Sequence, residues 1–180
     1  MSGLYADLVK LLIIVLVVLV HAYFVASEYS LVTLRKARVI KLLEDGNRAA
    51  ALILDTLDHL QELIAAVQLG VTMASLALGA LAEPTVASVL EPAFGFIPKN
   101  WSPLTAHAVA IAITFVLITA IDIVIGELVP KTISLQSGER VALLIIRPIR
   151  IFIRVFRPFI ALLNGAGGLV LRAVGYKPAP

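Results

Sequence analysis

The sequence predicts an all-α membrane protein with three transmembrane helices and a further amphipathic helix on the cytoplasmic side. Its 180 residues are 60% hydrophobic and 15% charged, and the mean hydropathy is +0.99. A soluble domain of this length would expose too much apolar surface. The apolar residues form three blocks, Leu8–Ala26, Leu63–Leu81 and Leu104–Ile125, each near the roughly 20 residues that a spanning helix needs. We therefore expect spans at about 8–30, 62–82 and 104–128.

The basic residues predict the orientation of these spans. Lys10, near the start of the first block, is the only basic residue at its N-terminal end, and only Lys99 lies between the second and third blocks, whereas many basic residues follow the first and third blocks. By the positive-inside rule the N-terminus lies outside and the C-terminus is cytoplasmic. Trp101 is expected to anchor the outer end of the third span. The net charge of +3 thus reflects topology and does not indicate nucleic-acid binding.

The first block resembles the apolar core of a signal peptide, with small residues at Val25-Ala26-Ser27. A cleaved signal carries its positive charge before that core, whereas here the charges follow it. We expect an uncleaved helix.

Two further stretches predict helices that do not span the membrane. Residues Asn47–Asp58 have the pattern of an amphipathic surface helix on the cytoplasmic side. Residues Val141–Leu163 carry arginines at spacings of three, four and three, which places them on one helical face: Arg147, Arg150, Arg154 and Arg157. This helix is expected in the membrane interface or along a neighbouring bundle, with its guanidinium groups at lipid phosphates or a cytoplasmic surface. A less favoured alternative is that this helix is a fourth span whose arginine face contacts water within the membrane.

Proline and glycine positions predict the remaining boundaries. Pro148 and Pro158 favour a kinked helix, Asn164–Gly168 a loop or a weak packing turn, and the proline-rich stretch 83–103 an extracellular loop. The expected organisation is a transmembrane domain at 1–136, an amphipathic juxtamembrane region at 137–175, and a linker at 176–180 toward a cytoplasmic part that this chain lacks. Three helices are too few to enclose a pathway, so oligomerisation is expected.

The segment Gly126-Glu127-Leu128-Val129-Pro130-Lys131 ends the third apolar block and carries the strongest functional signal. A carboxylate in a membrane costs about 2.5–3.5 kcal/mol on insertion scales, so Glu127 indicates a functional site. Pro130 has no amide to donate to the Gly126 carbonyl four residues earlier, which predicts a helix break and a carbonyl oxygen able to bind an ion.

The other two spans also contribute oxygen atoms. The first ends in Ser27 and Glu28, and the second contains Thr72 and Ser75, while Asp122 precedes the segment above. Hydroxyls, a carboxylate and backbone carbonyls are ligands for a small hard cation such as Mg²⁺.

Several of these residues also have structural explanations. Serines in membrane helices commonly hydrogen-bond to a carbonyl of their own helix, which is the structural explanation for Ser75, and Glu127 and Lys131 have the spacing of a helix-end ion pair. Asp122 either faces a water cavity or pairs with a polar group such as Thr119. The three histidines, His21, His59 and His107, lack the spacing of a zinc helix and are interpreted as packing or interfacial residues. No catalytic motif is present in the sequence, so an enzyme is not expected.

Three motifs together resemble the transmembrane domain of the CorC and cyclin M magnesium transporter family. They are Ser27-Glu28, the stretch Leu69–Gly79 with Glu83-Pro84, and Gly126–Lys131 with its glycine-glutamate-x-x-proline-lysine signature. The resemblance covers nearly the whole chain. It implies a homodimer of three-span subunits that exports Mg²⁺ in exchange for Na⁺. The dimer would lie in the plasma membrane, which in a bacterium is the inner membrane.

The resemblance also implies roles for individual residues. Mg²⁺ would be held by the side chains of Ser27, Ser75 and Glu127 and by the carbonyl of Gly126. Pro130 would break the helix and Lys131 would steady its end, while Glu28 would bind Na⁺ or support the shell. Members usually continue into cytoplasmic regulatory modules that bind ATP and Mg²⁺.

Two other functions remain open at this point. A membrane domain that senses Mg²⁺ or serves as a scaffold would use the same residues without moving the ion. A plain anchor and dimerisation domain would use Ser27, Ser75 and Glu127 only for hydrogen bonds between helices.

Overall fold

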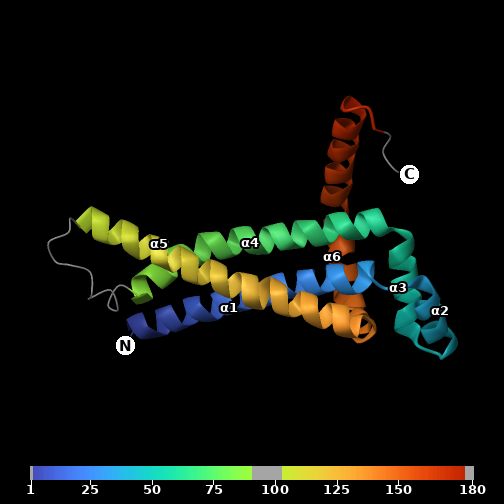
Figure 1. The fold of residues 1–180 in the computed structure, drawn as a ribbon, viewed down its shortest axis with the longest axis horizontal. Coiled ribbons are helices and arrows are strands. Elements are labelled where there is room, and N and C mark those ends of the chain that lie inside the picture. Colours follow the sequence, from blue (N-terminus) through green and yellow to red (C-terminus); the bar gives the residue numbers. More distant parts are fainter. Residues whose placement is uncertain (1, 91–102, 177–180) are drawn as a thin grey trace. The chain divides into compact units, whose positions relative to one another are not determined.

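The computed structural model describes residues 2–90 and 103–176, and every element in these ranges is a helix (Figure 1). In chain order the elements are α1 (Ser2–Val32), α2 (Lys36–Glu44), α3 (Arg48–Asp58), α4 (Leu60–Leu90), α5 (Pro103–Ile121), the π-helix η2 (Asp122–Leu128) and α6 (Val129–Ala173). Among the described residues, three helical stretches are long and apolar enough to cross a membrane: Leu8–Val32, Leu60–Leu81 and Ile111–Ala173. The prediction of an all-helical chain with three such stretches is confirmed. Trp101 lies outside the described residues.

The chain divides into two compact units, which are described separately. The first unit comprises Met1–Tyr23 and Thr72–Pro130, and the second comprises Phe24–Val71 and Lys131–Pro180. Helices α1 and α4 each contribute one part to each unit.

The first unit has a small apolar core made by α1, α4 and α5. Val18 and Leu78 are buried there, and Ile14, Val17 and Ile118 pack against them. The outer faces of the same helices are apolar as well, since Leu12, Leu76 and Phe115 are all about two-thirds exposed. Lipid tails solvate such side chains, so a sparse core with an apolar exterior suits helices in a bilayer.

A short helical hairpin, α2 and α3, opens the second unit. Gly46 takes a positive φ of 86° between the two helices, a conformation that favours glycine. Asn47 then caps α3, because its side-chain oxygen accepts a 3.0 Å hydrogen bond from the Ala49 amide. Helix α3 agrees with the predicted surface helix, whereas α2 was not predicted. Val39 is fully buried and sits three residues before the half-buried Leu42, which is the amphipathic signal for α2.

The second unit is held together by close contacts of α1, α4 and α6. A Cβ built on Gly70 would lie 2.3 Å from a ring carbon of Phe24, so only glycine lets this ring rest against α4. The ring of Phe24 meets that of Phe152 edge to face at 4.8 Å. Ile146 and Ile149 on α6 are fully buried, which makes this unit the better packed of the two.

Three local features of the helices differ from the predicted ones. Helix α4 continues through Pro84 to Leu90, so the predicted loop at 83–103 is helical over its first eight residues. The segment Asn164–Gly168 lies inside α6 and is not a loop, because glycine weakens a helix by about 1 kcal/mol per residue but keeps its backbone donor. The residue of α6 with non-helical backbone angles is Ser137 (φ −132°, ψ 35°) and neither Pro148 nor Pro158.

Candidate ion-binding site

The predicted helix break near Gly126 takes the form of a π-helix. Residues Asp122–Leu128 form η2, and the Val129 amide donates to the carbonyl of Val124, five residues earlier. Helix α6 begins at Val129 and passes through Pro130, so the irregular geometry predicted around Pro130 is a change from π to α geometry. The wider turn accommodates the missing proline amide without ending the helix. Single π-turns inside α-helices often mark functional sites.

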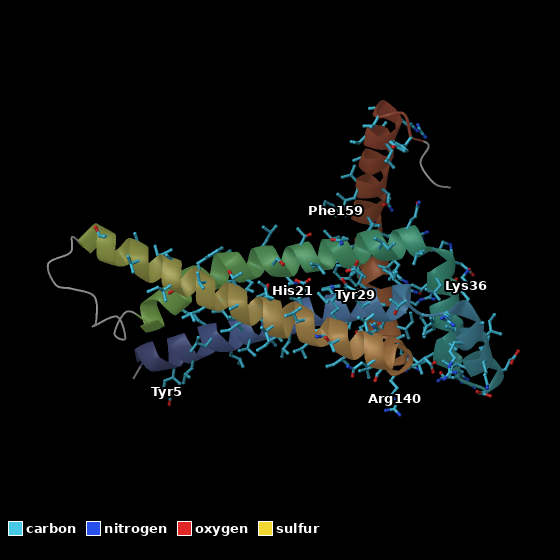
Figure 2. The ribbon with its side chains drawn as sticks, viewed as in Figure 1. Tyr5, His21, Tyr29, Lys36, Arg140 and Phe159 are labelled. Atoms are coloured by element: carbon cyan, nitrogen blue, oxygen red, sulfur yellow. The ribbon has the colours of Figure 1, made fainter. Side chains whose placement is uncertain are left out.

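Asp122, the first residue of η2, contacts a buried histidine on α1. The Nδ1 atom of His21 lies 2.8 Å from Oδ1 of Asp122, and the histidine is 6% exposed. Either group donates to the other, depending on which holds the proton. In the structure, Asp122 thus pairs with a polar group, and that group is His21, which was expected to be a packing or interfacial residue. Figure 2 labels His21 on α1.

Gly126 allows these two side chains to lie against the backbone of η2. A Cβ at this position would be 2.5 Å from Oδ1 of Asp122 and 3.1 Å from Nδ1 of His21. Real Cβ atoms essentially never show the first of these distances, so the Asp122 carboxylate would have to shift if a side chain were added here. Gly126 is itself buried. Residues His21, Asp122 and Gly126 therefore form one compact polar cluster within the first unit.

The remaining predicted ligands of the first unit are accessible. Thr72 and Ser75 on α4 and Glu127 on η2 all have exposed side chains, whereas Pro130 is buried. Exposure leaves their oxygen atoms open to water, to an ion or to a second copy of the chain.

Ser27, the fourth predicted ligand residue, belongs to the second unit and is fully buried. Two hydroxyl groups donate hydrogen bonds to backbone carbonyls at and next to Ser27. Ser134 Oγ donates to the Ala26 carbonyl at 3.2 Å, and Ser30 Oγ donates to the Ser27 carbonyl at 3.4 Å. Ser134 and Ser30 are also buried. Sequence reasoning missed Ser134, which has no stronger signal than a hydroxyl four residues after Pro130, among other polar residues.

Lys131 lies in the second unit as well. Its ammonium nitrogen is 4.6 Å from the centre of the Tyr29 ring, a cation–π contact between α6 and α1. This contact fixes the first turn of α6 to the end of α1. Glu28, next to Tyr29, is half-buried.

The described part of the chain contains no group of three or more His, Cys, Asp and Glu side chains that would hold a metal ion. The predicted ligands belong to a different class, because two of them are hydroxyls and one is a backbone carbonyl. The site residues therefore stay a prediction, while the His21–Asp122–Gly126 cluster is a feature of the structure.

Comparison with known proteins places nearly the whole chain in one family. The family model described as "Cyclin M transmembrane N-terminal domain" matches residues 11–180. The "UPF0053 protein YhdT" of Bacillus subtilis is 39% identical over 96% of this chain and 37% of its own length. The "UPF0053 protein YhdP" of the same organism is 36% identical over 95% of this chain and 38% of its own length. In Synechocystis, the "UPF0053 protein sll0260" is 32% identical over 92% of this chain and 37% of its own length.

The chain thus spans about two fifths of the length of these curated relatives. The match over 170 residues includes the second and third apolar stretches, the π-helix, and all but the first three residues of the first stretch. This chain belongs to the cyclin M transmembrane N-terminal domain family.

Proposed function

We propose that this domain carries Mg²⁺ out of the cell in exchange for Na⁺. The observation that supports it most is the π-helix Asp122–Leu128, which sets a carboxylate and a close-packed glycine in the third apolar stretch of a cyclin M domain. Charged groups in a bilayer are costly, and their retention in membrane helices usually serves an ion pathway.

The residues proposed to hold Mg²⁺ are those that the family resemblance implies. Ser27, Ser75 and Glu127 would contribute side-chain oxygens, and Gly126 would contribute its carbonyl. Thr72, Glu28 and Asp122 are proposed as support for this shell or as the Na⁺ site, with Pro130 and Lys131 shaping the end of η2. One carboxylate among neutral oxygens binds Mg²⁺ moderately, which suits a transported ion that must also be released.

Transport requires that the ligands separate when the helices move. A ligand shifts an equilibrium between two conformations only by its difference in affinity for them. Ligands that come from different helices offer such a difference, because a small displacement of one helix removes one oxygen from the shell.

The domain is proposed to lie in the plasma membrane, which in a bacterium is the inner membrane, with its N-terminus outside and its C-terminus in the cytoplasm. The distribution of lysine and arginine supports this orientation. A homodimer is proposed, because the family resemblance implies one and because three spanning helices are too few to enclose a pathway. Regulation would belong to cytoplasmic modules outside this chain.

The first experiment measures thermal unfolding of the detergent-purified chain across a Mg²⁺ titration. Binding to the folded state stabilises it by about 2.7 kcal/mol when the ligand is at 100 times its Kd. We expect Mg²⁺ to raise the Tm of the wild type and of Glu44→Gln, a control at an exposed site on α2. The gain should be lost in Ser75→Ala and Glu127→Gln. An unchanged Tm in the wild type would favour the anchor function instead.

Binding alone does not separate transport from sensing. A Mg²⁺ sensor would show the same titration and the same loss in the variants, but it would not move the ion across a sealed membrane. A flux measurement on reconstituted vesicles makes this distinction.

A further inference from the structure

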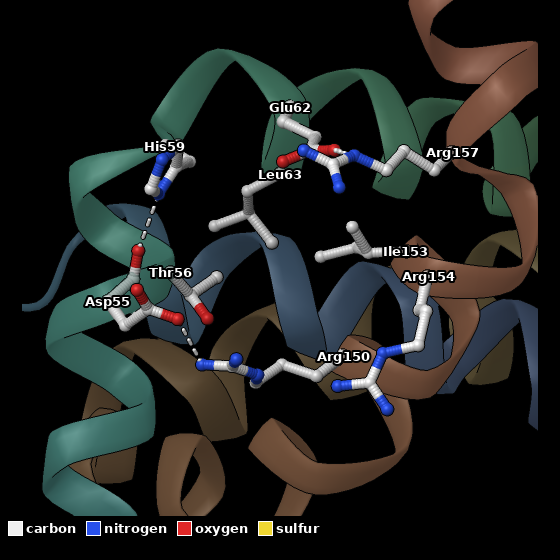
Figure 3. A pocket seen from close by; sticks show the side chains of 9 residues that line it. All are labelled: Asp55, Thr56, His59, Glu62, Leu63, Arg150, Ile153, Arg154 and Arg157. Atoms are coloured by element: carbon white, nitrogen blue, oxygen red, sulfur yellow. Dashed lines mark hydrogen bonds and ion pairs between the residues drawn. The ribbon is translucent and has the colours of Figure 1, made fainter.

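A pocket in the second unit is lined mainly by charged side chains of α3, the start of α4, and α6 (Figure 3). Its volume is about 240 Å³. The acidic side chains on its wall are Asp55 and Glu62, and the basic ones are Arg150, Arg154 and Arg157. None of these residues belongs to the proposed Mg²⁺ site.

Two of the arginines are held by acidic partners. Arg150 Nη1 donates to Oδ2 of Asp55 and, at 3.3 Å, to the carbonyl of Leu52. Arg157 Nε lies 3.4 Å from Oε1 of Glu62. These contacts fix both arginines on the pocket wall while leaving most of their guanidinium donors unused, because each group has five.

Arg154 differs from its two neighbours. It lines the same pocket but makes no ion pair or hydrogen bond with any residue in the described ranges 2–90 and 103–176. In the view of Figure 3 its guanidinium lies near the side chain of Arg150, whose own guanidinium is directed to Asp55. Two like charges facing one pocket repel each other unless an anion lies between them.

The charges of the pocket sum to a single positive charge. Three arginines oppose two carboxylates, and the ring of His59 makes a 2.9 Å contact from Nδ1 to the carbonyl of Asp55. A small anion with several oxygen atoms would satisfy the unused guanidinium donors. Arginine forks match the oxygens of a phosphate group in this way.

The position of the pocket along the helices indicates where such an anion comes from. Glu62 and Leu63 lie at the beginning of the apolar stretch Leu60–Leu81, where a spanning helix meets the headgroups. On α6 the exposed apolar residues Ile151 and Val155 flank the arginines. A helix with adjacent apolar and basic faces is typical of the membrane interface.

We propose that this pocket binds a phosphate group, with Arg154 as its principal donor. An anionic lipid headgroup and free inorganic phosphate share this chemistry. The proposal is independent of the proposed Mg²⁺ transport.

The test measures the thermal stability of the detergent-purified full chain with three probes at constant ionic strength: inorganic phosphate, short-chain phosphatidic acid and short-chain phosphatidylcholine. The variant is Arg154→Gln. The matched control is Arg147→Gln, which removes the same charge from the same face of α6 but does not line the pocket. Arg154→Lys is a second variant, which keeps the positive charge but removes the planar guanidinium that donates two parallel hydrogen bonds.

We expect phosphatidic acid to bind the wild type and Arg147→Gln alike, and to bind Arg154→Gln about tenfold more weakly. Arg154→Lys should fall between them. Stabilisation by phosphatidic acid alone identifies a lipid headgroup as the source, and stabilisation by inorganic phosphate as well identifies a site for any phosphate group. The absence of an effect from both probes would overturn the proposal. An equal loss in Arg147→Gln and Arg154→Gln would also overturn it, because that result describes a general basic surface.

Discussion

His21 on α1 and Asp122 on η2 are joined by a contact of 2.8 Å between Nδ1 and Oδ1. The contact links two helices of the first unit at the turn where the third apolar stretch changes from α to π geometry. Both side chains also lie over Gly126, where a Cβ would collide with them. The backbone of the predicted ion site is therefore braced by Asp122 of the same π-helix and by His21 of a different helix, α1.

The pair should contribute to stability as a unit. Replacing either partner leaves the other without its hydrogen bond in a largely buried place, which costs about 1–3 kcal/mol. We expect His21→Ala and Asp122→Ala each to lower the free energy of unfolding by this amount in detergent. The double variant should cost less than the sum of the two, because the second substitution removes a group that is already unpaired. Additive effects would show that the two residues are not coupled.

Gly126→Ala should destabilise the chain. The new methyl group would lie 2.5 Å from Oδ1 of Asp122, so the carboxylate must move and the His21 contact with it. Overpacking of this kind costs about 1–3 kcal/mol. Thermal unfolding measures the effect.

Gly79→Ala is the matched control for this substitution. Gly79 also lies in a helix, but nothing stands within 4 Å of a Cβ built there. Alanine is a better helix former than glycine by about 1 kcal/mol, so we expect this variant to be as stable as the wild type or more so. A similar loss in both variants would contradict the close packing at Gly126.

Asp58 provides a pH-dependent prediction outside the apolar stretches. The hydrogen bond and the positive charge of Lys36, 2.6 Å away, lower the pKa of this carboxyl group below its ordinary value. The contact between α2 and α3 thus contributes above the pKa of the unfolded chain. Its contribution is lost as the pH falls through the lowered pKa of the folded chain.

Carbon-13 NMR of the Asp58 carboxyl group checks this prediction. We expect Lys36→Met to raise its pKa toward the ordinary value, while Lys41→Met, which removes a charge elsewhere on α2, leaves it unchanged. The same pKa in the wild type and in Lys36→Met would show that the pair does not form in solution.

Those parts of the fold that depend on local hydrophobic pattern were predictable. The three apolar stretches and the surface helix α3 follow from the length and spacing of apolar residues. Helix α2 was missed because it has only nine residues, four of them charged, so its single buried residue, Val39, gave a weak signal.

Polar pairs between distant residues were not predictable in the same way. His21 and Asp122 are 101 positions apart, and no spacing rule connects them. The sequence did indicate an irregular turn at Gly126 and Pro130, but it could not distinguish a helix break from a π-helix. That choice depends on whether neighbouring turns can widen to accommodate the missing amide. Similarly, the glycines at 165–168 weaken a helix without deciding where it ends.

The measurement that tests the central claim most directly is Mg²⁺ efflux from vesicles that contain the purified chain. The vesicles are loaded with Mg²⁺ and diluted into buffer with or without Na⁺, and a Mg²⁺-sensitive dye follows the ion outside. We predict Na⁺-dependent efflux for the wild type and for Glu44→Gln, and its loss in Glu127→Gln. Efflux from wild-type vesicles no faster than from protein-free vesicles, or unchanged efflux in Glu127→Gln, would contradict the account.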